Sequence, residues 1–198
     1  GSNFKVGKSK YYVCEADEYN NNFLNYRSDV AIVLNVAWDH PDFFKTEEQL
    51  HQSYLNFIKN IKKDGVLIIP SDPKLESLAE QAKEPREDIQ VVKVGEFEKI
   101  DLKIIGAFRQ QNANAALTLG KILNLDLEKA KSSSQNSTGV RRRLESTGDL
   151  NNIKFYDDYA VQPYTILKSA DALKDMFPDE KVALVLEPHT FSRLEKFA

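Results

Sequence analysis

The feature that most constrains the fold is a pair of continuous apolar runs, each typical of a buried strand, with a capped helix between them. Residues 30–36 (VAIVLNV) form a continuous apolar run, which is typical of a strand covered on both faces. Residues 46–49 (TEEQ) match the capping box that begins a helix, and apolar residues recur behind it at helical spacing as far as Ile61. Gly65 ends this helix, and residues 66–69 (VLII) form the next apolar run. This order predicts a β-α-β unit with parallel strands.

The same alternation continues along the chain and predicts an α/β fold with a mostly parallel sheet. Residues 131–138 (KSSSQNST) are the most loop-like stretch, and the pattern restarts after them. We therefore predict one domain over residues 1–136 and the first part of another over residues 137–198, which holds too few strands for a doubly wound domain. The other predicted strands are 10–15, 91–94, 102–105, 140–145, 153–156 and 182–186, and the other predicted helices are 75–82, 112–123 and 164–176.

Composition and charge argue against several classes of protein. No apolar run approaches the roughly 20 residues that a membrane helix needs, so we expect no membrane partner. The 27 Lys and Arg residues against 30 Asp and Glu give a net charge of −3, which disfavours a general nucleic-acid binder. The single cysteine, Cys14, cannot form an internal disulfide, and we expect a reducing, cytoplasmic compartment.

One glycine motif resembles a nucleotide-binding signature without meeting its requirements. Gly7-Lys8-Ser9 matches the end of a phosphate-binding loop, but Ser2 stands where that loop needs its first glycine. The loop also needs a strand before it and a helix after it, whereas a strand is predicted next. We therefore interpret this segment as a solvated loop.

Polar residues follow several predicted strands, at the edge of a parallel sheet where ligands gather. The sharpest pair is Glu15 and His40, which could share a divalent cation. Magnesium prefers oxygen ligands, so zinc must also be considered, although three histidines and one cysteine argue against a closed structural zinc site. Each residue also has a structural interpretation, because such a carboxylate often caps a helix and such a histidine can simply bond a strand end. The polar clusters are 15–18, Asn35 with 39–42, 157–159, and 187–189.

A run of three arginines, Arg141 to Arg143, adds a concentrated positive charge. On the predicted strand, the first and third side chains would point to one face and the second to the other. That geometry suits one or two arginines aimed at phosphate oxygens. A charged edge strand explains the same run equally well.

Six segments in a consistent order resemble the Mur ligase family. The resemblance implies a three-domain, ATP-dependent ligase of peptidoglycan precursor synthesis, with this chain as most of the central ATP-binding domain and the opening of a Rossmann-like C-terminal domain. The family's own phosphate loop would lie upstream of this segment, so we expect the fragment alone to be inactive. The matching segments are 15–24 (EADEYNNNFL), 35–44 (NVAWDHPDFF), 106–116 (GAFRQQNANAA), 139–145 (GVRRRLE), 156–160 (YDDYA) and 187–193 (EPHTFSR).

The resemblance is strongest to the alanine-adding members, and it implies the cofactors ATP and Mg²⁺. Those members join L-alanine to UDP-N-acetylmuramate through an acyl phosphate. By the resemblance, Glu15 and His40 would each hold a magnesium ion, and Asn112 would meet the adenine. Arg143 would contact the ATP phosphates, with a catalytic role, and Asp158 would approach the ribose or phosphate side.

On the acceptor side, the resemblance places His189 and Arg193 as catalytic residues that line the substrate. The chain departs from the family here, because Val161 and Gln162 replace two histidines that commonly precede Pro163. The loss of an imidazole removes all its hydrogen bonds, which leaves the acceptor open. A murein-peptide ligase acting on the same sugar is therefore the alternative within the class.

Two hypotheses from other classes stay open. The first is a degenerate nucleotide-binding module without catalysis, which the missing phosphate loop and histidines suggest. The second is an unrelated α/β metal-dependent hydrolase that uses Glu15, Asp39, His40 and Asp42. The hydrolase hypothesis predicts metal binding without ATP. The chain also departs from the Mur ligase pattern at Arg109, where the family usually has asparagine, and this change favours none of the hypotheses.

Overall fold

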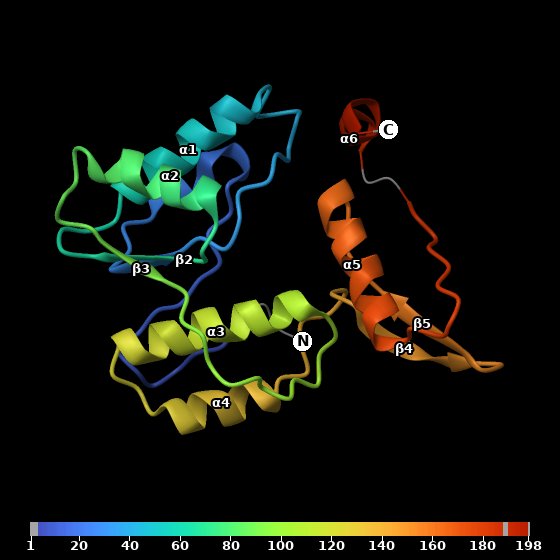
Figure 1. Ribbon diagram of the computed structural model, residues 1–198. Helices are drawn as coiled ribbons and strands as arrows, with labels where there is room; N and C mark the ends of the chain where they lie inside the picture. The colour runs from blue at the N-terminus through green and yellow to red at the C-terminus, as the bar shows by residue number, and fades with distance from the viewer. Residues whose placement is uncertain (1–3, 188–189, 198) are drawn as a thin grey trace.

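The computed structural model describes residues 4–187 and 190–197 and confirms the predicted α/β class (Figure 1). A three-stranded parallel sheet and its helices form one region, and a hairpin with two helices forms a second. In chain order the elements are η1 (Tyr19–Asn25), β1 (Val30–Ile32), α1 (Glu47–Lys59), β2 (Val66–Ile69), α2 (Pro73–Lys83), β3 (Gln90–Lys93), α3 (Ala107–Ile122), α4 (Leu127–Gln135), β4 (Glu145–Leu150), β5 (Ile153–Asp157), α5 (Pro163–Met176) and α6 (Phe191–Phe197).

The sheet is parallel, as the alternation of apolar runs and helices predicts, and its strand order is β1-β2-β3. Val66 of β2 is paired with Val30 on one side and with Gln90 on the other. The first strand is shorter than the predicted 30–36, although Val33 N still donates to Ile68 O at 3.0 Å. Among the described residues, no strand pairs with the outer edge of β1, so β1 and β3 are the two edges of this sheet.

Helices cover both faces of the sheet. Figure 1 shows α1 and α2 on one face and α3 on the other, with α4 beyond α3. The predicted cap of α1 is present, because Thr46 Oγ1 accepts a bond from Gln49 N at 3.2 Å. The return bond differs from the usual box, since Gln49 Oε1 accepts from Lys45 N rather than from Thr46 N. The main core lies between the sheet and α1 and α2, and includes Phe23, Ala31, Val33, Phe57, Ile58, Leu67, Ile69, Leu75 and Leu78.

Helix α1 ends at Lys59, with Asn60 as its C-cap, and not at the predicted Gly65, which lies in the turn before β2 at a very close approach of backbone. A Cβ at this position would lie 2.9 Å from Asp29 O and 2.5 Å from the Ile61 side chain. The glycine therefore allows the chain leaving α1 to pass under the start of β1 and to enter β2. Val66 N donates to Asp29 O at 3.0 Å directly after this turn.

The second region is a hairpin with α5 packed against it. Strands β4 and β5 pair antiparallel, with an irregularity between Ser146 and Gly148. Its small core contains Leu144, Ala172 and Leu173, and Phe108 of α3 packs against this cluster from the first region. No helix in the described part of the chain has the length and apolar character that crossing a bilayer requires.

Three predicted strands are wrong. Residues 10–15, 102–105 and 182–186 carry no strand, and no described strand pairs with them. The first and last segments expose most of their apolar side chains, and Val185 is fully exposed, although Val182 packs against the small cluster of the second region. A strand exists only where a second strand accepts its backbone hydrogen bonds, so an apolar β-branched pattern is not sufficient.

The linker and the arginine strand also need correction. Most of the predicted loop 131–138 is helix α4, which begins where Asp126 accepts from Lys129 N; its serines also bond back to the helix, as Ser134 Oγ does to Ala130 O. Of the predicted strand 140–145, only Glu145 is in a strand, as the first residue of β4, because the chain turns at Arg142 and Leu144, which have positive φ angles of 56° and 50°. The three arginines therefore do not alternate across a strand.

Candidate functional site

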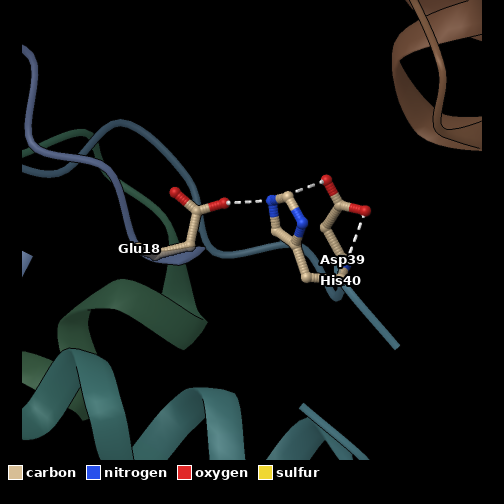
Figure 2. A group of neighbouring side chains, drawn as sticks. All are labelled: Glu18, Asp39 and His40. Carbon is tan, nitrogen blue, oxygen red and sulfur yellow. Dashed lines mark hydrogen bonds and ion pairs between the residues drawn. The ribbon is translucent and has the colours of Figure 1, made fainter. Parts of the chain in front are cut away.

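The loop after β1 and the start of η1 bring together two carboxylates and an imidazole. His40 Nε2 lies 3.5 Å from Glu18 Oε1 and 3.4 Å from Asp39 Oδ2. Figure 2 shows the imidazole of His40 between the two carboxyl groups. The ligand atoms of these three residues all lie within 4.8 Å of one another. The cluster lies beyond the carboxyl end of β1, where ligands of parallel sheets bind.

Local backbone geometry holds His40 in this position. The residue has a φ of 54°, a left-handed conformation that histidine adopts more readily than most residues. Asp39 Oδ1 accepts a bond from His40 N at 2.7 Å, and His40 O accepts from Phe43 N and Phe44 N. The Tyr19 ring lies against the imidazole, with centroids 4.6 Å apart.

The turn that presents Glu18 also has a local cause. Asn20 and Asn21 both adopt positive φ angles, which asparagine tolerates, and they bend η1 directly after Glu18. Asn21 then accepts a bond from Ser53 of α1, which anchors the turn to the first helix. The asparagine run of the sequence therefore shapes the acidic side of the site.

Asp39 is buried, with 5% of its surface exposed, and is fully engaged. Arg193 of α6 donates through Nε to Oδ1 and through Nη2 to Oδ2, both at 2.8 Å. Gln162, the N-cap residue of α5, donates its amide to Oδ2. Burial opposes ionisation of Asp39, but the bonds from Arg193, His40 N and Gln162 outweigh it and lower the pKa of the carboxyl. The bonds to Asp39 in turn raise the pKa of Arg193.

The side chains of this cluster can supply part of the ligand set of a magnesium ion. Asp39 already uses both oxygens on Arg193, so Glu18 and His40 are the residues whose side chains, about a quarter exposed, face outward. Magnesium keeps several waters and takes few protein ligands when substrate phosphates complete its shell. One carboxylate and one imidazole therefore suit a phosphate-bridged ion, and they do not form a closed cage.

A second polar cluster joins α3 to the hairpin region. Arg109 Nη2 donates to Arg143 O at 2.9 Å, and Arg143 Nη1 donates to Tyr159 O at 3.2 Å. Asp158 accepts from Leu144 N at 3.3 Å and from the Ser169 hydroxyl. Burial lowers the pKa of Arg109, and within the described residues its Nε has no hydrogen-bond partner. This cluster places several positive groups beside one carboxylate.

The predicted site residues are distributed unevenly over these clusters. His40 and Arg193 lie in the first cluster, and Arg143 and Asp158 lie in the second. Glu15 is exposed and does not belong to the group around His40.

Two further predicted residues lie outside both clusters. Asn112 is exposed on α3, three positions after Arg109. His189 falls outside the described residues.

Sequence reasoning missed two members of the first cluster. Glu18 lies in the same acidic run as Glu15, and the asparagines that follow it were the available signal for a tight turn. Gln162 attracted notice only as a replaced histidine, and no local pattern links it to Asp39, 123 residues away.

Comparison with known proteins gives matches to one family of ligases. Residues 2–99 match the family described as Mur ligase middle domain. The chain is 32% identical, over its whole length, to a protein named UDP-N-acetylmuramate--L-alanine ligase from Arthrobacter sp. (strain FB24), of which it covers 47%. A protein of the same name from Caldanaerobacter subterraneus subsp. tengcongensis is 32% identical over 98% of the chain, with 47% of that protein covered.

A solved structure supports the fold. The UDP-N-acetylmuramate-alanine ligase of Thermotoga maritima matches with a TM-score of 0.65 at 18% identity, covering 88% of this chain and 45% of that one. At this identity the match concerns the fold alone.

The sheet, the site at its carboxyl edge and these matches define the class: the chain belongs to the Mur ligase family. The curated relatives that it matches share the name UDP-N-acetylmuramate--L-alanine ligase, and the chain spans about half of their length. The resemblance predicted from the six ordered segments is confirmed.

Proposed function

We propose that this chain contributes the central nucleotide-binding region and the start of the closing domain of an ATP-dependent ligase that joins L-alanine to UDP-N-acetylmuramate. The observation that carries the proposal is 32% identity to two proteins of that name, over 100% and 98% of the chain. The carboxylate–imidazole cluster at the carboxyl end of β1 supports it, because a phosphoryl-transfer enzyme needs a cation site at such an edge.

The magnesium ligands in this proposal are His40 and an acidic residue of the 15–18 run. The family resemblance favours Glu15, whereas the geometry favours Glu18, whose Oε1 lies 3.5 Å from His40 Nε2. When bound, the ion would neutralise charge on the phosphate oxygens of ATP. Asp39 remains outside the ligand set because Arg193 occupies both of its oxygens.

The nucleotide side of the proposed site is formed by α3 and the hairpin region. Arg143 would donate to phosphate oxygens, since its guanidinium is exposed beside the Tyr159 carbonyl. Asp158 would face the ribose or phosphate side, and Asn112 on exposed α3 would meet the adenine. Arg109 holds the Arg143 carbonyl and so fixes the segment that carries this arginine.

The proposed reaction has two steps. An oxygen of the muramyl carboxylate attacks the γ-phosphorus of ATP, the bond to the bridging oxygen breaks, and ADP leaves. The amine nitrogen of L-alanine then attacks the acyl carbon, a C–N bond forms, the C–O bond to phosphate breaks, and phosphate leaves as the amine loses a proton. Catalysis in such transfers is mainly positioning and charge neutralisation. Replacing Arg143 by alanine is expected to lower the rate by about 10²-fold.

The acceptor side leaves one alternative with its own observation. The family histidines are replaced by Val161 and Gln162, and Gln162 uses its amide on Asp39. An acceptor site remodelled in this way also suits a larger peptide. The alternative is therefore a murein-peptide ligase on the same sugar, with Arg193 and His189 on the acceptor side in either case.

The test is a substrate assay with the full-length protein. Release of phosphate from ATP is measured with UDP-N-acetylmuramate and either L-alanine or an alanyl-glutamyl tripeptide as acceptor. Turnover that requires L-alanine supports the first proposal, and turnover that requires the tripeptide selects the alternative. If the protein binds ATP but does not turn it over with either acceptor, the ligase proposal is wrong and the protein is a nucleotide-binding module.

Matched variants decide between the two acidic ligands. Glu15→Gln and Glu18→Gln keep the side-chain size and remove one negative charge each. The variant that removes the true ligand is expected to need a higher Mg²⁺ concentration for half-maximal rate. The other variant is expected to match wild type. Glu47→Gln, at an exposed position of α1, is the control for loss of charge alone.

A further inference from the structure

A buried ion pair joins the two regions, and it lies against the candidate cation site. Asp39 in the loop after β1 pairs with Arg193 of α6, 154 residues away, through two bonds of 2.8 Å. Only 8% of Arg193 is exposed. We infer that Asp39 is a positioning residue that couples the docking of α6 to the orientation of His40.

The first step of the argument concerns the bonds of a single carboxylate. Oδ1 of Asp39 accepts both from His40 N, at 2.7 Å, and from Arg193 Nε. The bond to His40 N holds a residue whose backbone is in the left-handed region. Arg193 therefore holds Asp39 Oδ1 in place, and this oxygen in turn holds the His40 backbone. The orientation of the imidazole thus depends on a contact from α6.

The second step concerns geometry and specificity of the pair. A two-bond arginine–carboxylate contact defines an orientation, whereas a lysine would supply only a point charge. Gln162 adds a third element, because its amide bonds Oδ2 from the N-terminus of α5. Asp39 is thus the common acceptor for the loop after β1, for α5 and for α6.

The third step concerns the imidazole itself. Its Nε2 is turned toward Glu18 and Asp39 Oδ2, at 3.5 Å and 3.4 Å. Outer partners of a metal ligand commonly change metal affinity by about 10- to 100-fold when they are removed. The inference rests on the proposed function insofar as His40 holds the cation, and it adds the residues that act through His40 without touching the ion.

The first experiment measures docking without any reaction. Cysteines replace Glu48 of α1 and Glu195 of α6, both exposed, in the chain with Cys14→Ser, and spin labels on them report a distance distribution. Wild type is expected to give one narrow distribution. Asp39→Asn and Arg193→Gln are expected to broaden it, and Arg27→Gln, an exposed arginine changed in the same way, is expected to leave it narrow. A distribution in Arg193→Gln as narrow as wild type would overturn the docking role.

The second experiment separates positioning from plain charge. Binding of Mn²⁺, the probe ion, to the full-length protein is followed by loss of its free-ion signal. Positioning predicts that Arg193→Gln weakens binding by about tenfold, as loss of an outer partner does. If Arg193 acted only as a nearby positive charge, its removal would strengthen Mn²⁺ binding, and that result would refute the inference. Arg193→Lys keeps the charge and loses the two-bond geometry, so it is expected to weaken binding as well.

The outcomes of the two proposals are distinguishable. A full-length protein without ligase turnover contradicts the proposed function, while the distance and Mn²⁺ measurements still decide the role of Asp39. A double variant, Asp39→Asn with Arg193→Gln, is expected to be no worse than the more damaging single variant, because Arg193 acts through its contact with Asp39. Additive effects would show that the two residues act separately. Should Asp39→Asn fail to fold, Arg193→Lys carries both tests.

Discussion

The two regions of this molecule are stabilised in different ways. In the first, β2 lies between two parallel neighbours with helices on both faces, and Leu67 and Ile68 are fully buried. In the second, the hairpin leaves Leu150, Ile153 and Phe155 exposed, and the buried cluster is small. A parallel sheet is enclosed by its own crossover helices, whereas a hairpin can present one face to solvent.

The difference implies a hierarchy of stability. The first region contains a large core of its own, whereas the second depends partly on contacts with the first: Phe108 against its core, Arg109 to the Arg143 carbonyl, and Asp39 to Arg193. Regions with few buried apolar contacts open at a lower free energy than well-packed cores. The candidate site around His40 lies on the first region, and Arg193 and Gln162, which bond Asp39, come from the second.

The largest expected effect comes from a change in the first core. Leu67→Ala removes a fully buried side chain from β2, and we expect a loss of about 2–5 kcal/mol in the free energy of unfolding. Urea denaturation followed by circular dichroism measures it. Leu67→Met, which conserves volume, is the control and should cost less than about 1.5 kcal/mol. A loss below about 1 kcal/mol for the alanine variant would contradict the packing difference between the regions.

A smaller effect is expected from the cap of α1. Thr46→Ala removes the oxygen that accepts from Gln49 N, and we expect a loss of about 1 kcal/mol. Thr46→Ser retains that oxygen and should stay close to wild type. The urea midpoints of the three proteins test this directly, and equal midpoints would mean that the cap contributes nothing to the first region.

The pH dependence of the first region is expected to include a contribution from Asp88. Arg86 donates to both of its carboxylate oxygens, at 2.8 and 2.7 Å, and holds the pKa of Asp88 well below its usual range. A folded-state pKa below the unfolded value of about 3.9 gives stability that is present above pH 4 and lost as the pH falls through the folded pKa. The advantage of wild type over Asp88→Asn should therefore be constant from pH 7 to 5 and shrink below pH 4. Asp101→Asn, at an exposed position, is the control, and its difference from wild type should not change in this way.

The smallest effect is expected on the open face of the hairpin. Leu150→Thr changes a side chain that is 64% exposed on β4, and the free energy of unfolding should stay within about 0.5 kcal/mol of wild type. The same urea titration as for Leu67→Ala provides the comparison. A loss as large as that of the core variant would mean that something covers this face in solution.

Local sequence signals predicted the first region well. The helix cap at Thr46 and the strand at 66–69 each depend on a few neighbouring residues, and the structure confirms both predictions. The runs 10–15 and 182–186 carry similar β-type patterns and form no strand, because a ladder needs a partner elsewhere in the chain. The turn before β4 was missed because positive φ angles at Arg142 and Leu144 have no signal in those residue types.

The site was predictable to a similar extent. The position of His40 after an apolar run identified it, since polar residues at strand ends of parallel sheets have a common location. The place of Glu18 beside His40, with Glu15 outside that group, depends on the geometry of the asparagine turn. The pairing of Asp39 with Arg193 spans 154 residues and two regions, so no pattern within a window could reveal it.

The edge of β1 has a practical consequence for handling the isolated chain. Within the described residues, the strand presents a row of backbone groups with no partner on its outer side, and Ile32 beside them is 37% exposed. Such an edge is a template for another strand, including the same strand of a second molecule. Concentrated samples of this polypeptide should therefore associate edge to edge, and a lysine in place of Ile32 should keep them monomeric.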